Sequence, residues 1–193
     1  MKVCGSLLQT FNREFSTSRT IKAIPSDSVS AYQSDPQLKQ ILRDASSCLE
    51  RGDLQSAIQF YQKAAELDHT NRGSYIYNIA VCYYQLGKVD VAISKWEESL
   101  KIDPGKPDTL VNLGNIYVVV KKDANKAIEY FQKAIELAPN DGEIAFNYAC
   151  TLEAVGKLGD AAKNYEVAHK NGIEKAGTNL RNVMAKILKE KLK

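Results

Sequence analysis

The residues of this chain that could do chemistry are few and far apart. The four cysteines stand at positions 4, 48, 82 and 150, and the two histidines are His69 and His169. A zinc site usually shows two ligands a few residues apart, and no such pair occurs here. The spacing therefore predicts no metal site and no cofactor. It favours Cys48, Cys82 and Cys150 as small hydrophobic residues of a protein in a reducing compartment.

Sequence motifs of catalysis are absent as well. The chain has no phosphate-binding loop, no H-E-x-x-H and no G-x-S-x-G. Acidic pairs such as Glu97-Glu98 fall on the outer side of a predicted helix, where they indicate solvated charge rather than paired acid and base. We therefore expect a protein that is not an enzyme.

Length, charge and hydropathy exclude further classes. The chain has 193 residues, and its longest hydrophobic run, residues 79 to 84, is six residues long. A helix that spans a bilayer needs about 20 apolar residues, so no transmembrane segment is expected. The net charge of +3 is too small to argue for nucleic acid.

The charge is unevenly distributed along the chain. Residues 1–24 carry a net charge of +3 and residues 174–193 carry +4, which leaves −4 for residues 25–173. The first segment is poor in acids and rich in Ser and Thr. As a helix it would gather five apolar residues on one side, with Lys2 and Arg13 opposite: Val3, Leu7, Leu8, Phe11 and Phe15.

This pattern is typical of a mitochondrial presequence. The alternative is a disordered N-terminal tail, so the location is the mitochondrial matrix or the cytoplasm. Residues 25–36 contain Ser, Asp and Pro without helical period and indicate a linker. Asp35 followed by Pro36 is a helix start signal.

From there on the chain repeats itself. Ala57, Ala92, Ala127 and Ala161 are spaced 35, 35 and 34 residues apart. A large aromatic residue follows each of them by four positions: Tyr61, Trp96, Phe131 and Tyr165. Each unit also has a small residue in an earlier apolar helix: Ala45, Ala80, Gly114 and Ala149. Such a period indicates stacked helix pairs that cannot cover their apolar faces alone.

The repeats resemble the tetratricopeptide repeat (TPR) family. The stretch 113–117 followed by Ala127, Phe131, Ala134 and Pro139 is close to the family signature. The resemblance implies an all-α, right-handed α-solenoid of four antiparallel helix-turn-helix repeats, at 37–71, 72–106, 107–140 and 141–171. Three units turn at a glycine, whereas the third has Lys121-Lys122-Asp123 there.

Residues 172–193 are expected to form a C-terminal capping helix, with an apolar stripe within about 178–191. The stripe comprises Leu180, Val183, Met184, Ile187 and Leu188. A terminal capping helix needs one apolar face, which covers the last repeat, and one polar face, which is exposed to solvent. A basic amphipathic helix can also bind anionic lipid or nucleic acid, and both alternatives stay open.

In the TPR family the first helix of each repeat lines a concave groove. The resemblance places Asn78, Asn112 and Asn147 there, where their amides could pair with the main chain of an extended peptide. The same amides could instead serve local hydrogen bonds of the repeat. The other predicted groove residues are Tyr77, Val81, Tyr84, Val111, Asn115, Val118 and Phe146.

A chaperone-type clamp for an acidic C-terminal tail is not expected. In the family such a clamp uses Lys, Arg and Asn at fixed groove positions, which here hold Leu42, Ser46, Asn78, Asp108 and Asn112. A bound carboxylate would lack the cations that it needs. The uncharged groove instead suits an apolar or helical segment of another protein.

Three functions are consistent with these features. The first is an adaptor or assembly factor that binds an apolar or extended partner segment in its groove. The second is a structural subunit of a larger complex, such as a mitochondrial one. The third is an RNA-binding helical-repeat protein, which the net negative charge of residues 25–173 disfavours.

Overall fold

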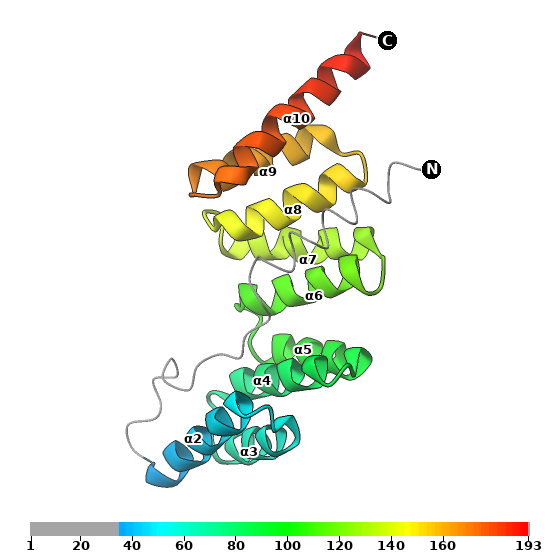
Figure 1. The fold of residues 1–193 in the computed structure, drawn as a ribbon. Coiled ribbons are helices and arrows are strands. Elements are labelled where there is room, and N and C mark those ends of the chain that lie inside the picture. The colour runs from blue at the N-terminus through cyan, green and yellow to red at the C-terminus, as the bar shows by residue number, and fades with distance from the viewer. Residues whose placement is uncertain (1–34, 193) are drawn as a thin grey trace. The chain divides into compact units, whose positions relative to one another are not determined.

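The structure is a computed structural model, and it describes residues 35–192. The predicted presequence or tail at residues 1–24 lies outside the described residues, as does most of the predicted linker. Over the described range the regular elements are nine α-helices and no strand (Figure 1). The helices are α2 (Pro36–Glu50), α3 (Leu54–Leu67), α4 (Arg72–Gln85), α5 (Val89–Ile102), α6 (Pro107–Val119), α7 (Ala124–Leu137), α8 (Gly142–Ala154), α9 (Leu158–Lys170) and α10 (Glu174–Lys191).

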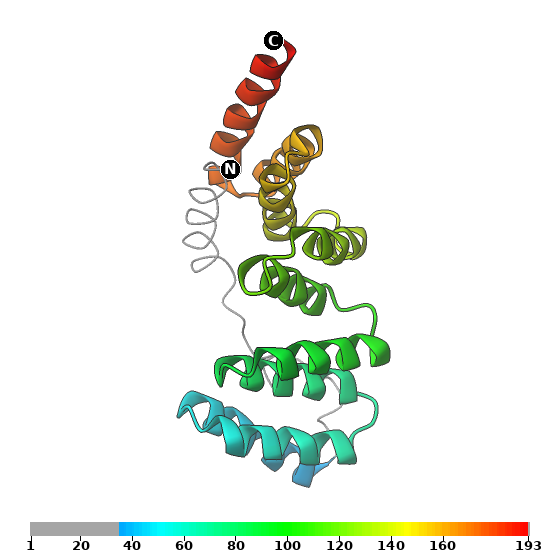
Figure 2. The same ribbon diagram turned by 90° about the vertical axis from the view of Figure 1, so that its right-hand side faces the viewer.

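Consecutive helices pair as hairpins, in two compact units. One unit contains the hairpins α2–α3 and α4–α5, with α3 packed on α4. The other contains α6–α7 and α8–α9, with α7 packed on α8 and α10 packed on α9 (Figure 2). We call them the unit 35–105 and the unit 106–192. The all-α class built from helix hairpins is therefore confirmed for the described residues.

The repeated small and aromatic residues form the cores of both units. The four alanines that set the period are fully buried, as are the aromatic residues Tyr61, Trp96, Phe131 and Tyr165. Gly114 on α6 shows why the small position is needed, because an added Cβ would lie 2.8 Å from the Phe131 ring. The small residue of the first helix thus lets the aromatic residue of the second helix pack directly against its backbone.

Acidic side chains begin several of the helices. The carboxylate of Asp35 accepts a hydrogen bond from the backbone N–H of Gln37 at 2.8 Å, and Pro36 occupies the first helical position. Asp53, Asp123 and Asp141 cap α3, α7 and α8 in the same way. These caps pair backbone N–H groups that have no partner within the helix.

The turns inside the hairpins require a left-handed backbone. Gly52, Gly87 and Gly156 have φ of 74°, 74° and 80°. In the third hairpin Lys122 occupies the corresponding place with φ of 57°. A residue with a Cβ is strained in this conformation, so the third turn keeps the geometry of the others at an energetic cost.

The last helix begins at Glu174, about one turn before the apolar stripe predicted within it. Its first half packs on α9 through Ala176, Gly177 and Val183, which are buried. Towards its C-terminal end it exposes Met184, Leu188 and Leu192. The helix therefore covers α9 as a cap does, but it keeps an apolar edge of its own in solvent.

Candidate binding surface

The predicted groove residues lie on the first helix of each hairpin. In the unit 106–192, Val111, Asn112 and Asn115 lie on α6, and Phe146 and Asn147 lie on α8. All five are buried, and so is Val118 on α6. On α6, Val111, Asn115 and Val118 are spaced by four and three residues and lie on one side of the helix, and Phe146 and Asn147 are adjacent on α8. We call this side of α6 and α8 the inner face of the unit 106–192.

Three side-chain amide atoms of the inner face have no hydrogen-bond partner among the described residues. They are the Asn115 Oδ1 atom and both the Nδ2 and Oδ1 atoms of Asn147. The two side chains are only 8% and 1% exposed. Leaving a buried polar group unpaired costs about 1–3 kcal/mol, so these three atoms do not stabilise the fold. The inner face therefore offers a donor and acceptors that are unused within residues 35–192.

Apolar side chains surround the two amides. Phe146 packs against the Tyr165 ring with centroids 5.7 Å apart, and the Lys175 Nζ atom of α10 lies 4.3 Å from the centroid of the Phe146 ring. Acidic residues occupy the first turns of the same helices: Asp108 is exposed on α6, and Glu143 is half-buried on α8. The surface is thus apolar with an acidic margin.

Helix α10 extends this surface, although the sequence predicted its apolar stripe only as part of a cap. Asn112, Asn147 and Arg181 are spaced by 35 and 34 residues, so Arg181 holds the place of the groove asparagine in a fifth first helix. Met184 and Leu188, 47% and 58% exposed, then lie on the inner side of α10. Extending the repeat period past residue 171 would have assigned both residues to the groove. We include this side of α10 in the inner face.

In the unit 35–105 the predicted groove residues lie on α4. Tyr77, Asn78 and Val81 are buried, and Tyr84 is half-buried. The rings of Tyr77 and Tyr84 pack on Trp96 of α5, with centroids 6.3 and 6.1 Å apart. Their aromatic faces are therefore engaged inside their own hairpin.

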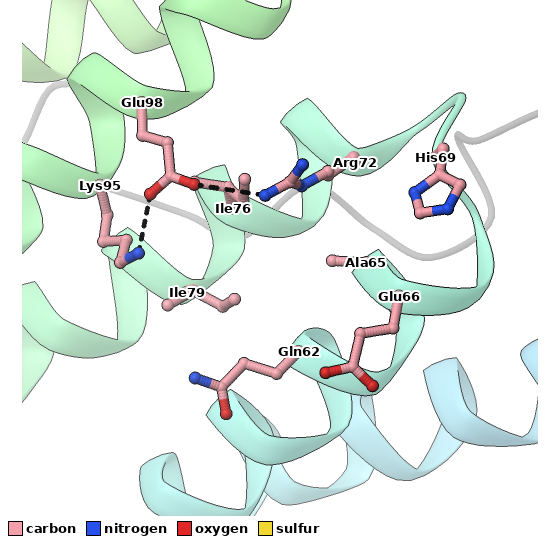
Figure 3. A pocket seen from close by; sticks show the side chains of 9 residues that line it. All are labelled: Gln62, Ala65, Glu66, His69, Arg72, Ile76, Ile79, Lys95 and Glu98. Atoms are coloured by element: carbon pink, nitrogen blue, oxygen red, sulfur yellow. Dashed lines mark hydrogen bonds and ion pairs between the residues drawn. The ribbon is translucent and has the colours of Figure 1, made fainter.

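A separate cavity of about 560 Å³ opens between α3, α4 and α5 of the unit 35–105 (Figure 3). Ala65, Ile76 and Ile79 supply its apolar lining. Its polar lining residues are Gln62, Glu66, His69, Arg72, Lys95 and Glu98. Two acidic and two basic side chains balance one another there, so the cavity has no net preference for a charged ligand.

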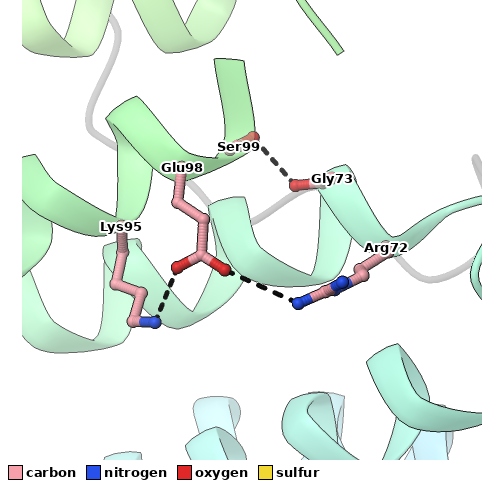
Figure 4. A network of polar contacts seen from close by, with 5 residues as sticks. All are labelled: Arg72, Gly73, Lys95, Glu98 and Ser99. Atoms are coloured by element: carbon pink, nitrogen blue, oxygen red, sulfur yellow. Dashed lines mark hydrogen bonds and ion pairs between the residues drawn. The ribbon is translucent and has the colours of Figure 1, made fainter. Parts of the chain in front are cut away.

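Three charged side chains of this cavity are paired with one another. Glu98 accepts from the Lys95 Nζ atom at 2.7 Å and lies 3.8 Å from Arg72, as Figure 4 shows. The partners are 35–50% exposed, and exposed pairs contribute at most about 1 kcal/mol. The firmer contact beside them is buried, where the Ser99 hydroxyl donates to the Gly73 carbonyl at 2.8 Å.

The cysteine thiols and the Tyr165 side chain are buried. Cys48, Cys82 and Cys150 are free thiols in the cores, and burial raises the pKa of Cys82 to about 12. Burial, with the nearby Cys150 and Glu153, also raises the pKa of Tyr165. Neither group ionises near neutral pH. No cluster of three or more His, Cys, Asp or Glu residues suited to a metal ion occurs in the part of the chain that the structure describes.

A membrane-spanning helix is also missing from residues 35–192, since none of their helices combines the required length and hydropathy.

Known proteins share these repeats. Family models of the tetratricopeptide repeat match residues 74–106, 107–141 and 130–163, and a Sel1 repeat model matches residues 45–69. Photosystem I assembly protein Ycf3 of Prochlorococcus marinus (strain MIT 9301) is 29% identical over 112 residues, which cover 50% of this chain and 65% of that protein. BBSome complex member BBS4 of Bos taurus is 33% identical over 108 residues, 55% of this chain and 20% of that protein. The chain thus spans less than two thirds of either relative.

Solved structures have the same fold. A MamA fragment from Desulfovibrio magneticus RS-1 aligns with a TM-score of 0.66 at 17% identity, over 82% of this chain and 89% of that one. The first TPR domain of Spaghetti (RPAP3), bound to the HSP90 peptide SRMEEVD, aligns with a TM-score of 0.56 at 21% identity, over 62% of this chain and 95% of that one. These likenesses confirm the predicted α-solenoid. The family models, which match residues 74–163, show that the chain is a tetratricopeptide repeat protein.

Proposed function

We propose that the chain is an adaptor or assembly factor that binds a segment of another protein on the inner face of the unit 106–192. The unpartnered Asn147 amide and the unpartnered Oδ1 atom of Asn115 carry this proposal. A protein keeps buried polar groups without partners where function requires them, because an apolar residue of similar size would be more stable. An extended peptide offers main-chain N–H and C=O groups that pair with both atoms of an amide.

The surroundings of the amides favour an apolar partner segment. Val111 and Phe146 lie beside them, and Met184 and Leu188 of α10 add exposed apolar area. Apolar pockets between main-chain contacts are a common way to read alternate side chains of an extended segment. A segment with apolar residues and few acidic ones fits best, since Asp108 and Glu143 would repel carboxylates.

The comparisons support this role without naming a partner. Ycf3 is named as an assembly protein, and the RPAP3 domain was solved with a bound peptide. An acidic tail of the kind bound there is not the ligand that we propose, because Asp108 stands where the clamp needs a cation. The proposed role is non-catalytic, and it needs no cofactor.

A permanent structural subunit would use the same surface. The two roles differ in the lifetime of the complex, because an adaptor releases its partner and a permanent subunit does not. An RNA-binding role is disfavoured by the acidic residues at the inner face, since RNA contacts require cations. A mitochondrial location remains a proposal that depends on residues 1–24, and a reporter fused to this segment tests it.

Site-specific photo-crosslinking tests the proposed function. A benzoylphenylalanine at the exposed position Met184 should crosslink to a defined segment of one partner, and the same group at Glu129 on α7 serves as the matched control. The crosslinked segment, made as a peptide, should bind the chain reversibly. A partner recovered equally from both positions, or a peptide without measurable affinity, would refute the proposal.

A further inference from the structure

The C-terminal end of α10 carries large apolar side chains that are exposed to solvent. Leu192 is 88% exposed, and Met184 and Leu188 are about half exposed. The three residues are four positions apart, so they form one line along the helix, which we call the distal stripe. Figures 1 and 2 show this end of α10 extending past α9. Single exposed apolar residues are ordinary, but a continuous line of them marks an interaction surface.

The capping role of α10 does not account for the distal stripe. Helix α9 has 13 residues, whereas α10 has 18. The residues that α10 buries are Ala176, Gly177 and Val183. After Val183 every residue up to Leu192 is exposed except Ile187, which is half-buried. The last turns of α10 therefore add apolar area that covering α9 does not require.

An ion pair fixes how α10 lies on the unit 106–192. The Lys186 Nζ atom donates to Glu153 of α8 at 2.6 Å, and the Glu153 side chain is only 10% exposed. Glu153 also accepts from the Tyr165 hydroxyl at 2.8 Å, so it is held in place. At 100° per residue, Lys186 falls on the side of α10 opposite the distal stripe. The pair therefore holds α10 with the stripe facing away from Glu153.

Basic residues border the distal stripe. Residues 181–192 contain four basic side chains and one acidic one, a net charge of +3. Lys189 and Lys191 are exposed, and at 100° per residue they fall on either side of the stripe. This basic margin contrasts with the acidic margin that Asp108 and Glu143 form on α6 and α8. The end of α10 therefore suits a different ligand from the rest of the inner face.

The apolar stripe and its charge together select the ligand. A second copy of the chain would bring two segments of net charge +3 together, and they would repel each other. A nucleic acid would pair with the lysines but would leave the leucines in water. An anionic bilayer offers phosphate groups for the lysines and an apolar interior for the leucines.

We propose that residues 184–192 of α10 bind the surface of a lipid bilayer that contains anionic lipids. The distal stripe enters the boundary between headgroups and acyl chains, as in other basic amphipathic helices that lie in the interface. Lys189 and Lys191 contact lipid phosphates, and their methylene stems lie along the same apolar boundary. The inference goes beyond the proposed function, because it names a second ligand that requires no partner protein.

Co-sedimentation of the full chain with vesicles tests the apolar contact. The chain should bind phosphatidylcholine vesicles with about 30% phosphatidylserine at least about tenfold more tightly than pure phosphatidylcholine vesicles. Leu188→Gln with Leu192→Gln should weaken this binding at least about tenfold. The matched control Leu67→Gln with Leu137→Gln changes leucines that are 48% and 47% exposed on α3 and α7, and it should keep the binding. Equal binding by the two double variants would overturn the proposal.

A second pair of variants tests the charges. Lys189→Gln with Lys191→Gln should weaken binding to the anionic vesicles about 10- to 30-fold and should reduce its salt dependence. Lys101→Gln with Lys133→Gln removes the same charge from exposed positions on α5 and α7 and should change the affinity less than about threefold. An equal loss in both pairs would show attraction by net charge alone and would contradict a site on α10.

Tryptophan fluorescence locates the contact. The emission of a Leu188→Trp variant should move to shorter wavelength when anionic vesicles are added, because the indole leaves water. The control Lys163→Trp, at an exposed position on α9, should show no such shift. An unshifted Leu188→Trp spectrum on bound vesicles would refute insertion of the distal stripe.

The remaining outcomes assign the surface to another ligand or separate it from the proposed function. A polyuridine RNA that binds through Lys189 and Lys191 while vesicles do not bind would overturn the proposal. A dimer that dissociates in Leu188→Gln with Leu192→Gln, again without vesicle binding, would also overturn it. If vesicles bind as expected but photo-crosslinking at Met184 yields no partner segment, the bilayer contact stands and the proposed function fails.

Discussion

Replacing Gly114 by alanine tests the packing of the repeats quantitatively. The new Cβ would lie 2.8 Å from the Cε1 and Cζ atoms of Phe131 and 3.1 Å from its Cδ1 atom. Ordinary contacts of this kind are about 3.5–4.0 Å long, so the ring would have to shift by more than half an ångström. Phe131 is fully buried and packs near Tyr148, with centroids 6.5 Å apart, so the shift would disturb a packed core.

Two opposing effects set the magnitude. Overpacking a buried position costs about 1–3 kcal/mol, and exchanging glycine for alanine inside a helix gains about 1 kcal/mol. Gly114→Ala should therefore destabilise the fold by about 0–2 kcal/mol. In a Phe131→Leu background the contact disappears and the same change should stabilise it by about 1 kcal/mol. The double-mutant cycle should thus give a coupling energy of about 1–3 kcal/mol.

Urea unfolding of the four proteins, followed by circular dichroism, measures this coupling. Gly159→Ala on α9 is the matched control, because nothing lies within 4 Å of its added Cβ and it should not lose stability. A Gly114→Ala variant that gains as much stability as the control, with no coupling to Phe131, would refute the packing described for the first helix of the repeat.

Three further perturbations follow from the structure. Lys122→Gly should stabilise the fold by about 0.5–1 kcal/mol by relieving a positive φ, whereas Lys121→Gly should destabilise it, as thermal melts would show. Trp96→Ala should cost about 3–5 kcal/mol in urea unfolding by opening a cavity in a fully buried site, and an unchanged midpoint would contradict the assigned register. Burial raises the pKa of Asp68, but hydrogen bonds from Asn71, Tyr75 and Thr70 outweigh it, so the folded pKa lies below the unfolded one. The hydrogen-bonded Asp68 carboxylate therefore stabilises the fold above about pH 4. This stabilisation is lost as the pH falls through the pKa of Asp68 in the folded state. Tyr75→Phe removes the 2.8 Å bond to Asp68, and its cost of about 1 kcal/mol at neutral pH should shrink in acid; a constant cost would contradict this.

The sequence predicted the fold well because its signals are local and repeated. The alanine period and the aromatic residue four positions later are consequences of close helix packing, and both kinds of residue are fully buried. The start of α2 at Asp35 and Pro36 was equally predictable from the sequence, because a helix cap depends only on residues within one turn. These features depend on residues that are close in the chain or a constant number of residues apart, so the sequence alone predicts them.

The candidate site was less predictable, because it depends on what packs over the first helices. The sequence pointed to Asn147 and Asn115 but could not show that the Asn147 amide and the Asn115 Oδ1 atom lack partners. It placed Lys122 in an unusual turn without showing that its backbone adopts the glycine conformation. The inner side of α10 was missed because Arg181 replaces the repeated asparagine, so the pattern of residue types ends one helix before the surface does.

The measurement that tests the central claim most directly compares Asn147→Ala with Asn125→Ala, an exposed position on α7. The Asn147 amide has no hydrogen-bond partner within the described chain, so its removal should leave the free energy of unfolding unchanged or slightly higher. The same change should weaken binding of the crosslinked partner peptide at least about fivefold, by loss of about 1 kcal/mol or more, while Asn125→Ala keeps full affinity. A destabilised Asn147→Ala variant that binds the peptide normally would show that the amide serves the fold, and it would contradict a binding role for the inner face.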